Sequence, residues 1–144
     1  MSTRIAALLA ALLVAVAAHA QDRPRQPDPK ALQSIFSCMA AGLPKDWNKA
    51  WVVVRELGNS AGEGKFQAEF RYTTSPKDVS GQPLHPCDSR RVAGEVYGLN
   101  HYLSAEQQNW RSARLTFTRR ADGASYQLKY EYPSAPGGSE APAK

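Results

Sequence analysis

Three segments of this chain alternate apolar and polar residues, the pattern of a strand that buries one face. They are Lys65 to Thr74, Trp110 to Thr118 and Ser125 to Tyr132. A fourth segment, Ala50 to Leu57, has the β-branched and aromatic content of a strand. Turn residues join these segments in pairs, at Asn59 to Gly64 and at Asp122-Gly123. The sequence therefore predicts two β-hairpins.

Each predicted hairpin follows a segment with helical periodicity. Asp28-Pro29 provides an N-cap and a proline at the first helical position, Gly42 suits the end of this helix, and a second helix is expected from Asp88 or Ser89. The apolar stripes are Leu32, Ile35, Phe36, Met39 and Leu43 in the first helix, and Val92, Val96, Leu99 and Leu103 in the second. The predicted fold class is α+β, a four-stranded antiparallel sheet with two helices on one face, in the order α-β-β-α-β-β.

The first twenty residues are predicted to be a cleavable export signal. Arg4 precedes a stretch of almost pure Ala, Leu and Val, and Ala18-His19-Ala20 offers the small residues that a signal peptidase recognises. The mature chain would begin at Gln21. Since the apolar stretch is shorter than the about 20 residues of a membrane span, we expect a periplasmic protein that does not span the membrane after cleavage. The alternative is an uncleaved amino-terminal anchor.

The mature chain is expected to hold one domain, at 31–133, because its length suits one hydrophobic core. Residues 21–30 are charged, amidic or proline, and 134–144 are small, polar or proline. Neither end can bury enough apolar surface to offset the entropy lost on ordering. Both ends are therefore predicted to be flexible tails, and 75–86, with its two prolines, is predicted to be a connecting loop.

Cys38 and Cys87 are the only cysteines. In an oxidising compartment they are expected to form a disulfide, which would join the end of the first helix to the start of the second. The alternative is a catalytic thiol with His85 or His101 as its base, although a free thiol outside the cytoplasm would be oxidised.

Other signs of catalysis or metal binding are weak. His85-Pro86-Cys87-Asp88 is one short segment and not a spaced set of metal ligands, and the sequence lacks the common nucleophile and phosphate-binding motifs. The formal net charge of +5 is spread along the chain, whereas nucleic-acid binding favours clustered Lys and Arg. We expect no enzymatic activity, no metal, no cofactor and no nucleic-acid partner.

The polar side of the predicted sheet is the candidate surface for a protein partner. Strand alternation places there Glu69, Arg71, Arg114, Lys129 and Glu131, with Trp110 at its edge. The alternative is an ordinary solvated sheet surface. The tryptophans can likewise close the edges of the core or stack on a sugar.

Several aromatic motifs follow one another along the chain. They are Asp46-Trp47-x-x-Ala50-Trp51-Val52-Val53-Val54, the strand from Phe66 to Tyr72, Trp110-Arg111-Ser112-Ala113-Arg114-Leu115-Thr116-Phe117 and the closing Lys129-Tyr130-Glu131-Tyr132. This order resembles the YezG-like family of small bacterial immunity proteins, over roughly Leu32 to Tyr132. The resemblance implies an α+β protein that neutralises a toxin by binding it.

Two features depart from that family, whose members are typically cytoplasmic: the signal and the cysteine pair. The expected partner is therefore a toxin or effector that acts in the cell envelope, such as a peptidoglycan-degrading or membrane-active one. Two alternatives remain, an inhibitor of host or phage lysozyme and a small envelope module that binds a ligand through its tryptophans and basic surface.

Overall fold

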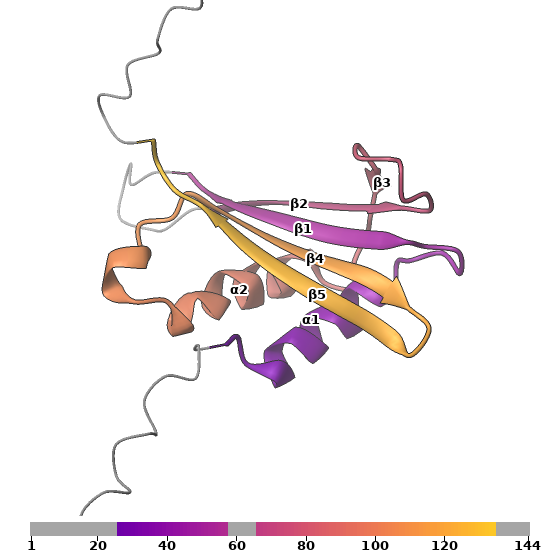
Figure 1. The fold of residues 1–144 in the computed structure, drawn as a ribbon, viewed down its shortest axis with the longest axis horizontal. Helices are drawn as coiled ribbons and strands as arrows, with labels where there is room; N and C mark the ends of the chain where they lie inside the picture. The colour runs from indigo at the N-terminus through magenta and orange to yellow at the C-terminus, as the bar shows by residue number, and fades with distance from the viewer. Residues whose placement is uncertain (1–25, 58–65, 135–144) are drawn as a thin grey trace, which may run out of the picture.

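The computed structural model describes residues 26–57 and 66–134, which form an α+β domain (Figure 1). The elements are α1 (Pro29–Ala40), β1 (Lys49–Glu56), β2 (Phe66–Thr73), β3 (Gln82–Pro83), α2 (Ser89–Gly98), the 3₁₀ helices η1 (Leu99–Tyr102) and η2 (Ala105–Gln107), β4 (Ser112–Arg120) and β5 (Gly123–Glu131). Both α-helices lie on one side of the sheet (Figure 1). The predicted fold class is confirmed at this level.

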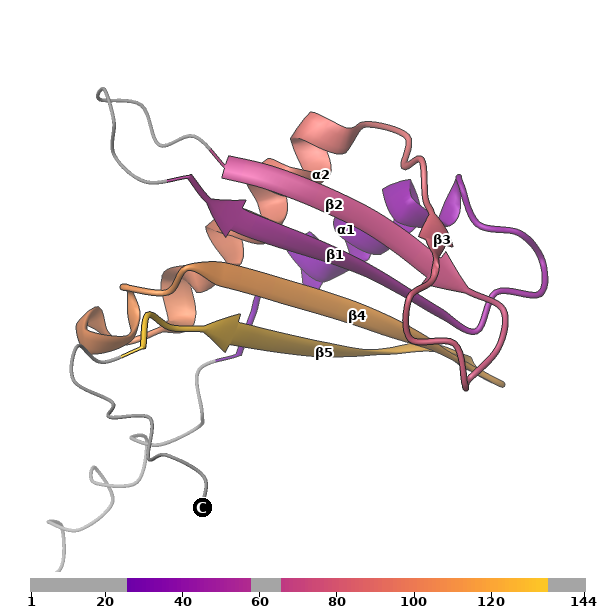
Figure 2. The ribbon, with the colours of Figure 1, turned by 90° about the horizontal axis from the view of Figure 1, so that it is seen from above.

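The described strands form one antiparallel sheet in the order β3-β2-β1-β4-β5 (Figure 2). The prediction of four strands is wrong, because β3 adds a fifth within 75–86, and the element order becomes α-β-β-β-α-β-β. Only two residues of β3 pair with β2, Pro83 with Arg71 and Gln82 with Tyr72. So short a strand has no side-chain periodicity by which a sequence could reveal it.

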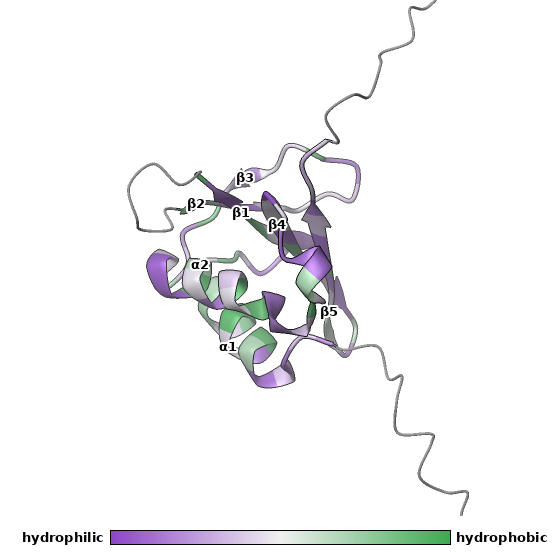
Figure 3. Cartoon of the chain, turned by 90° about the vertical axis from the view of Figure 1, so that its left-hand side faces the viewer, coloured by the Kyte–Doolittle hydropathy of each residue, from purple (hydrophilic) through white to green (hydrophobic). Residues whose placement is uncertain are grey.

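The core lies between the sheet and the two helices. Register aligns the helix-facing residues of neighbouring strands, so that Val52 lies beside Phe70 on one side and Leu115 on the other. Ile35 and Met39 from α1 and Val92 and Val96 from α2 cover this row and are fully buried. Figure 3 shows the two helices as one layer beneath the sheet. The burial of these aliphatic side chains is the main source of the domain's stability.

Both helices begin where the sequence predicts. The Asp28 carboxylate accepts a hydrogen bond from the Lys30 amide, and the Asp88 carboxylate accepts one from the Arg91 amide, each at 3.0 Å. These bonds satisfy amides that have no partner within the helix. The apolar stripe of the second helix extends past α2, which ends at Gly98, into η1.

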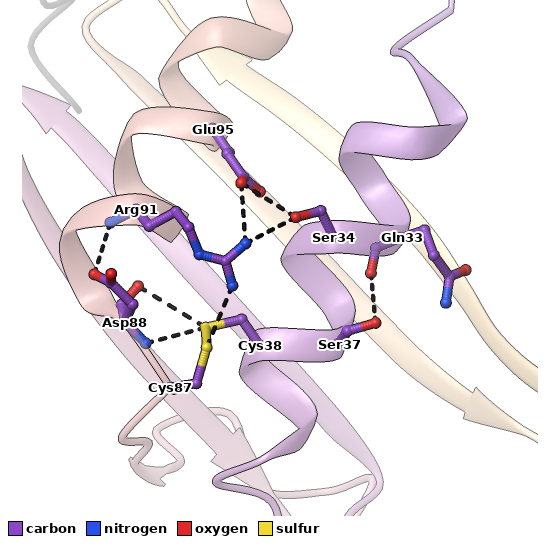
Figure 4. Close-up of polar contacts among 8 residues, drawn as sticks. All are labelled: Gln33, Ser34, Ser37, Cys38, Cys87, Asp88, Arg91 and Glu95. Atoms are coloured by element: carbon purple, nitrogen blue, oxygen red, sulfur yellow. Dashed lines mark hydrogen bonds and ion pairs between the residues drawn. A yellow bond between two sulfur atoms is a disulfide. The ribbon is translucent and has the colours of Figure 1, made fainter.

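Cys38 and Cys87 form the predicted disulfide, with their Cα atoms 5.0 Å apart (Figure 4). The Cys87 amide also donates to the Cys38 carbonyl at 3.0 Å. One turn further, the Arg91 guanidinium donates to Ser34 Oγ at 2.9 Å and pairs with Glu95 at 3.2 Å, so polar contacts extend the link between α1 and α2. The two helices are therefore held to each other covalently and by hydrogen bonds.

Several sequence predictions fall on residues that the structure does not describe. They are the export signal at 1–20, the tails apart from 26–30 and Ser134, and the whole turn at Asn59 to Gly64. Within 26–57 and 66–134, no helix is both long enough and apolar enough to cross a membrane.

Candidate protein-binding face

The side of the sheet opposite the helices is called the polar face here. Pairing register places on it Lys49, Trp51, Val53 and Arg55 of β1, Gln67, Glu69, Arg71 and Thr73 of β2, Ser112, Arg114, Thr116, Thr118 and Arg120 of β4, and Gly123, Ser125, Gln127, Lys129 and Glu131 of β5. Five predicted partner-binding residues lie on this face: Glu69, Arg71, Arg114, Lys129 and Glu131. The structure thus brings them together as strand alternation predicts.

Trp110 is the exception among the predicted binding residues. Its side chain is only 3% exposed and belongs to the core on the helix side of the sheet. Its ring packs against Tyr97 and Tyr130, at 5.3 Å between centroids in both cases. Trp110 precedes β4, so the alternation of that strand does not govern it, and burial of its large apolar ring does. The prediction that Trp110 lies at the edge of the binding surface is wrong.

Trp51 is the residue of this face that sequence reasoning missed. It points to the polar face, yet it is only 5% exposed. The Arg114 guanidinium lies over its ring, with Cζ 4.9 Å from the ring centroid, in a cation–π contact. Gly81 packs against the same ring so closely that an added Cβ would lie 2.5 Å from the Trp51 Cη2 atom. Trp51 therefore anchors both Arg114 and the chain at Gly81.

The segment from Thr74 to Gly81, which joins β2 to β3, folds against the polar face. Arg71 Nη1 donates to the carbonyls of Ser80 and Gly81, at 3.2 and 3.3 Å. Asp78 Oδ1 accepts from the amides of the same two residues, at 3.0 and 3.1 Å. The hydrogen bond from the Gly81 amide is the main reason that the pKa of Asp78 lies below its ordinary value. The loop and the sheet form one continuous surface, and Val79, 88% exposed, projects from the loop.

Charges on this face fall into paired and unpaired groups. Glu69 accepts a hydrogen bond from Arg71 Nε and pairs with Arg55 at 3.5 Å. The bond from Arg71 is the main reason that the pKa of Glu69 is lowered, so Glu69 is ionised at neutral pH. Within the described part of the chain, Arg114 and Lys129 take part in no ion pair. Arg71 and Glu69 therefore hold the loop, while Arg114 and Lys129 keep their charges available.

The polar face carries an excess of positive charge. Six basic residues of its strands, namely Lys49, Arg55, Arg71, Arg114, Arg120 and Lys129, outnumber its two acidic residues, Glu69 and Glu131. Glu131 in turn accepts a hydrogen bond from Ser112 Oγ at 2.8 Å. A basic surface of this kind is complementary to an acidic one on a partner.

The helix side offers a pocket of about 580 Å³ between the start of α1 and the end of α2, with Asp28, Glu95 and His101 in its wall. Glu95 Oε1 already accepts from Ser34 and Arg91, at 3.1 and 3.2 Å. Its other oxygen is buried and has no hydrogen-bond partner among the described residues. In the described ranges no three His, Cys, Asp or Glu side chains gather as metal ligands would. The alternative of a catalytic Cys87 or Cys38 thiol is wrong, because both sulfurs are bonded.

Neither a family model nor a curated protein matches this chain. The resemblance to the YezG-like immunity proteins stays a prediction.

Proposed function

We propose that this protein is an exported immunity protein, which binds a toxin or effector in the cell envelope through the polar face and so neutralises it. The observation that carries the proposal is the basic, loop-flanked polar face on the side of the sheet that the helices leave uncovered (Figures 1 and 2). The helices bury the other side, so this is the broad sheet surface that a partner can reach.

The structure of this face suits binding by contact. Its central contact, Arg114 over Trp51, combines a charged group with a large buried ring, and such residues dominate the energetics of many interfaces. The disulfide and the Asp78 hydrogen bonds hold the scaffold and the loop in place before a partner arrives. A surface that is already ordered loses less entropy on binding.

The positive charge of the polar face indicates which kind of envelope toxin it would bind. An acidic patch at or beside the toxin's active site would pair with Arg114 and Lys129, which are free of intramolecular ion pairs within the described residues. The attraction would speed association, and its strength would fall as salt is added. We therefore expect the toxin to present acidic side chains to this protein.

A co-culture experiment tests the proposal even while the toxin is unidentified. A strain that lacks this gene is either left uncomplemented or is given a plasmid that encodes the wild-type protein, the Arg114→Glu variant or the Arg90→Glu variant. Each of these strains then competes with the parent strain. Arg90 is exposed on α2, on the helix side, so its reversal makes the same charge change away from the polar face. We expect the deletion strain to be killed, and wild-type and Arg90→Glu proteins to protect it while Arg114→Glu does not.

Thermal denaturation of the two purified variants provides the folding control. Survival of the deletion strain without any complementation would refute the immunity function. Full protection by Arg114→Glu would place the binding surface elsewhere on the domain.

A further inference from the structure

The two edges of the sheet differ in how they are protected against pairing with another strand. One edge is β3, which has two residues and includes Pro83. The other is β5, which is nine residues long, from Gly123 to Glu131, and has no proline. Short edge strands and prolines discourage pairing with another chain, and a long regular edge permits it.

Cross-strand hydrogen bonds identify the backbone groups that β5 leaves unpaired. The Glu56 amide donates to the Arg111 carbonyl at 3.0 Å, and the Arg119 amide donates to the Asn48 carbonyl at 2.9 Å. The odd-numbered residues of β4 therefore point their backbone amides and carbonyls toward β1. The even-numbered residues of β4 therefore face β5, where they are paired with odd-numbered residues such as Lys129. The amides and carbonyls of Ala124, Tyr126, Leu128 and Tyr130 consequently point outward, away from the described sheet.

The side chains along this edge can match those of an identical strand. On the polar side, Lys129 and Glu131 are two residues apart and of opposite charge. On the helix side Tyr126, and just beyond the strand Tyr132, are each 43% exposed. Leu128 and Tyr130, between them, are partly buried against the core.

We propose that β5 pairs antiparallel with β5 of a second copy of this chain, about a two-fold axis at Tyr130. This register sets Lys129 of each copy opposite Glu131 of the other, so two ion pairs form across the axis. It also sets Leu128 opposite Tyr132 of the second copy, which covers part of the exposed Tyr132 ring. The outward amides and carbonyls at Leu128 and Tyr130 gain partners, and the two sheets become one.

Charge decides among the symmetric registers. An axis at Lys129 would place two lysines opposite each other, which is unfavourable. An axis at Leu128 would set Lys129 opposite Gln127 and Glu131 opposite Ser125, without an ion pair. The axis at Tyr130 satisfies both charges at once. The inference concerns the free protein and stands apart from the proposed function: Lys129 pairs with Glu131 of the second copy in the dimer, and would be available to a toxin only when the two copies separate.

A charge-swap series measured by sedimentation equilibrium at low salt tests this dimer. Lys129→Glu and Glu131→Lys each place like charges opposite one another, and each should raise the dimer dissociation constant about tenfold. The double swap, Lys129→Glu with Glu131→Lys, restores opposite charges and should return the constant to within about threefold of wild type. Lys77→Glu, an exposed residue of the loop beyond β2, should leave it unchanged.

A wild-type protein that stays monomeric throughout the accessible concentration range would overturn the proposal. The register, and with it the proposal, would be overturned if the single reversals left the dimer dissociation constant unchanged. It would also be overturned if the double swap failed to restore that constant. Amide hydrogen exchange gives a test without substitutions. Exchange at Leu128, Tyr130 and Tyr132 should slow as concentration rises, while exchange at Ala124 should not; equal slowing at Ala124 would contradict the axis at Tyr130.

Discussion

Removal of the disulfide between Cys38 and Cys87 should cost this domain a large share of its stability. Cys38 and Cys87 are separated by 49 residues, and a cross-link of that span lowers the entropy of the unfolded chain. In the chain-entropy model the effect is about 4 kcal/mol at 25 °C. A domain of this size is typically stable by only about 5–15 kcal/mol, so the link contributes a large share.

The variant is Cys38→Ala with Cys87→Ser. Cys38 is 2% exposed, so alanine avoids a buried hydroxyl, whereas Cys87 is exposed and tolerates serine. Urea unfolding followed by circular dichroism should show a loss of about 4 kcal/mol, which for a typical dependence on urea lowers the midpoint by about 2 M. The Asp88 amide, which lies 3.0 Å from Cys38 Sγ, also loses its acceptor, and this adds slightly to the loss.

The wild-type protein under reducing conditions is the matched control. Its stability should fall to that of the double variant, and reductant should leave the variant unchanged. A difference below about 1 kcal/mol between oxidised and reduced wild type would refute the reasoning, because the cross-link would then scarcely constrain the unfolded chain.

Two further predictions concern the loop on the polar face. Gly81→Ala should destabilise the domain by about 2 kcal/mol or more, because the backbone has a φ of +67° and the new Cβ meets the Trp51 ring. The control, Gly94→Ala, lies in open space on α2 and should stabilise the domain by up to about 1 kcal/mol. Equal effects of the two substitutions on the melting temperature would contradict the contact between Gly81 and Trp51. Because the pKa of Glu69 lies below its ordinary value of 4.5, its contribution to stability is complete above that pH and is lost as the pH falls through the lower folded-state value. Glu69→Gln should thus be less stable than wild type at pH 7 and approach it as the pH falls through the lowered pKa of Glu69, and parallel pH profiles of the melting temperature would exclude this role.

Local periodicity predicted most of the fold. Asp28 and Asp88 marked both helix starts, and alternation in β2, β4 and β5 placed Glu69, Arg114 and Lys129 on one face. These features depend on neighbours in sequence, so they can be read from a single chain. β3 depends on pairing with a distant segment and shows no such pattern.

The errors and omissions concern contacts that only the folded chain creates. Trp110 is buried because Tyr97 and Tyr130 meet it, and these residues are far from it in sequence. α1 ends at Ala40 with Ala41 as its C-cap, so Gly42 follows the helix end as predicted, but its φ is not positive, and an added Cβ there would collide with the His85 carbonyl, a contact that the sequence did not reveal. The contacts of the Arg71 guanidinium with the Ser80 and Gly81 carbonyls, which hold the loop, were likewise not foreseen, while its contact with a partner stays a prediction. Strand alternation gives the side on which a residue lies, and not what covers it.

The two sides of the sheet differ in what they contribute: the helix side contributes most of the stability, and the polar face contributes the exposed charges. The helices and the disulfide stabilise the domain from one side, so the polar face can keep charges that contribute little to stability. Arg114 is the clearest case, because it is exposed and unpaired by any carboxylate in the described residues, yet Trp51 fixes its position. A charge that is both oriented and available is suited to recognition.

This chain is proposed to be an immunity protein that acts outside the cytosol. The most direct test is to ask whether the chain protects a cell when it is exported and when it is kept in the cytosol. The gene-deleted strain carries either the full sequence or a version without residues 2–20, at equal protein levels, and competes with its parent. Survival is counted for both. We predict that only the exported chain raises the survival of the gene-deleted strain. This proposal would be contradicted if the chain without residues 2–20 protected the strain as well as, or better than, the exported chain.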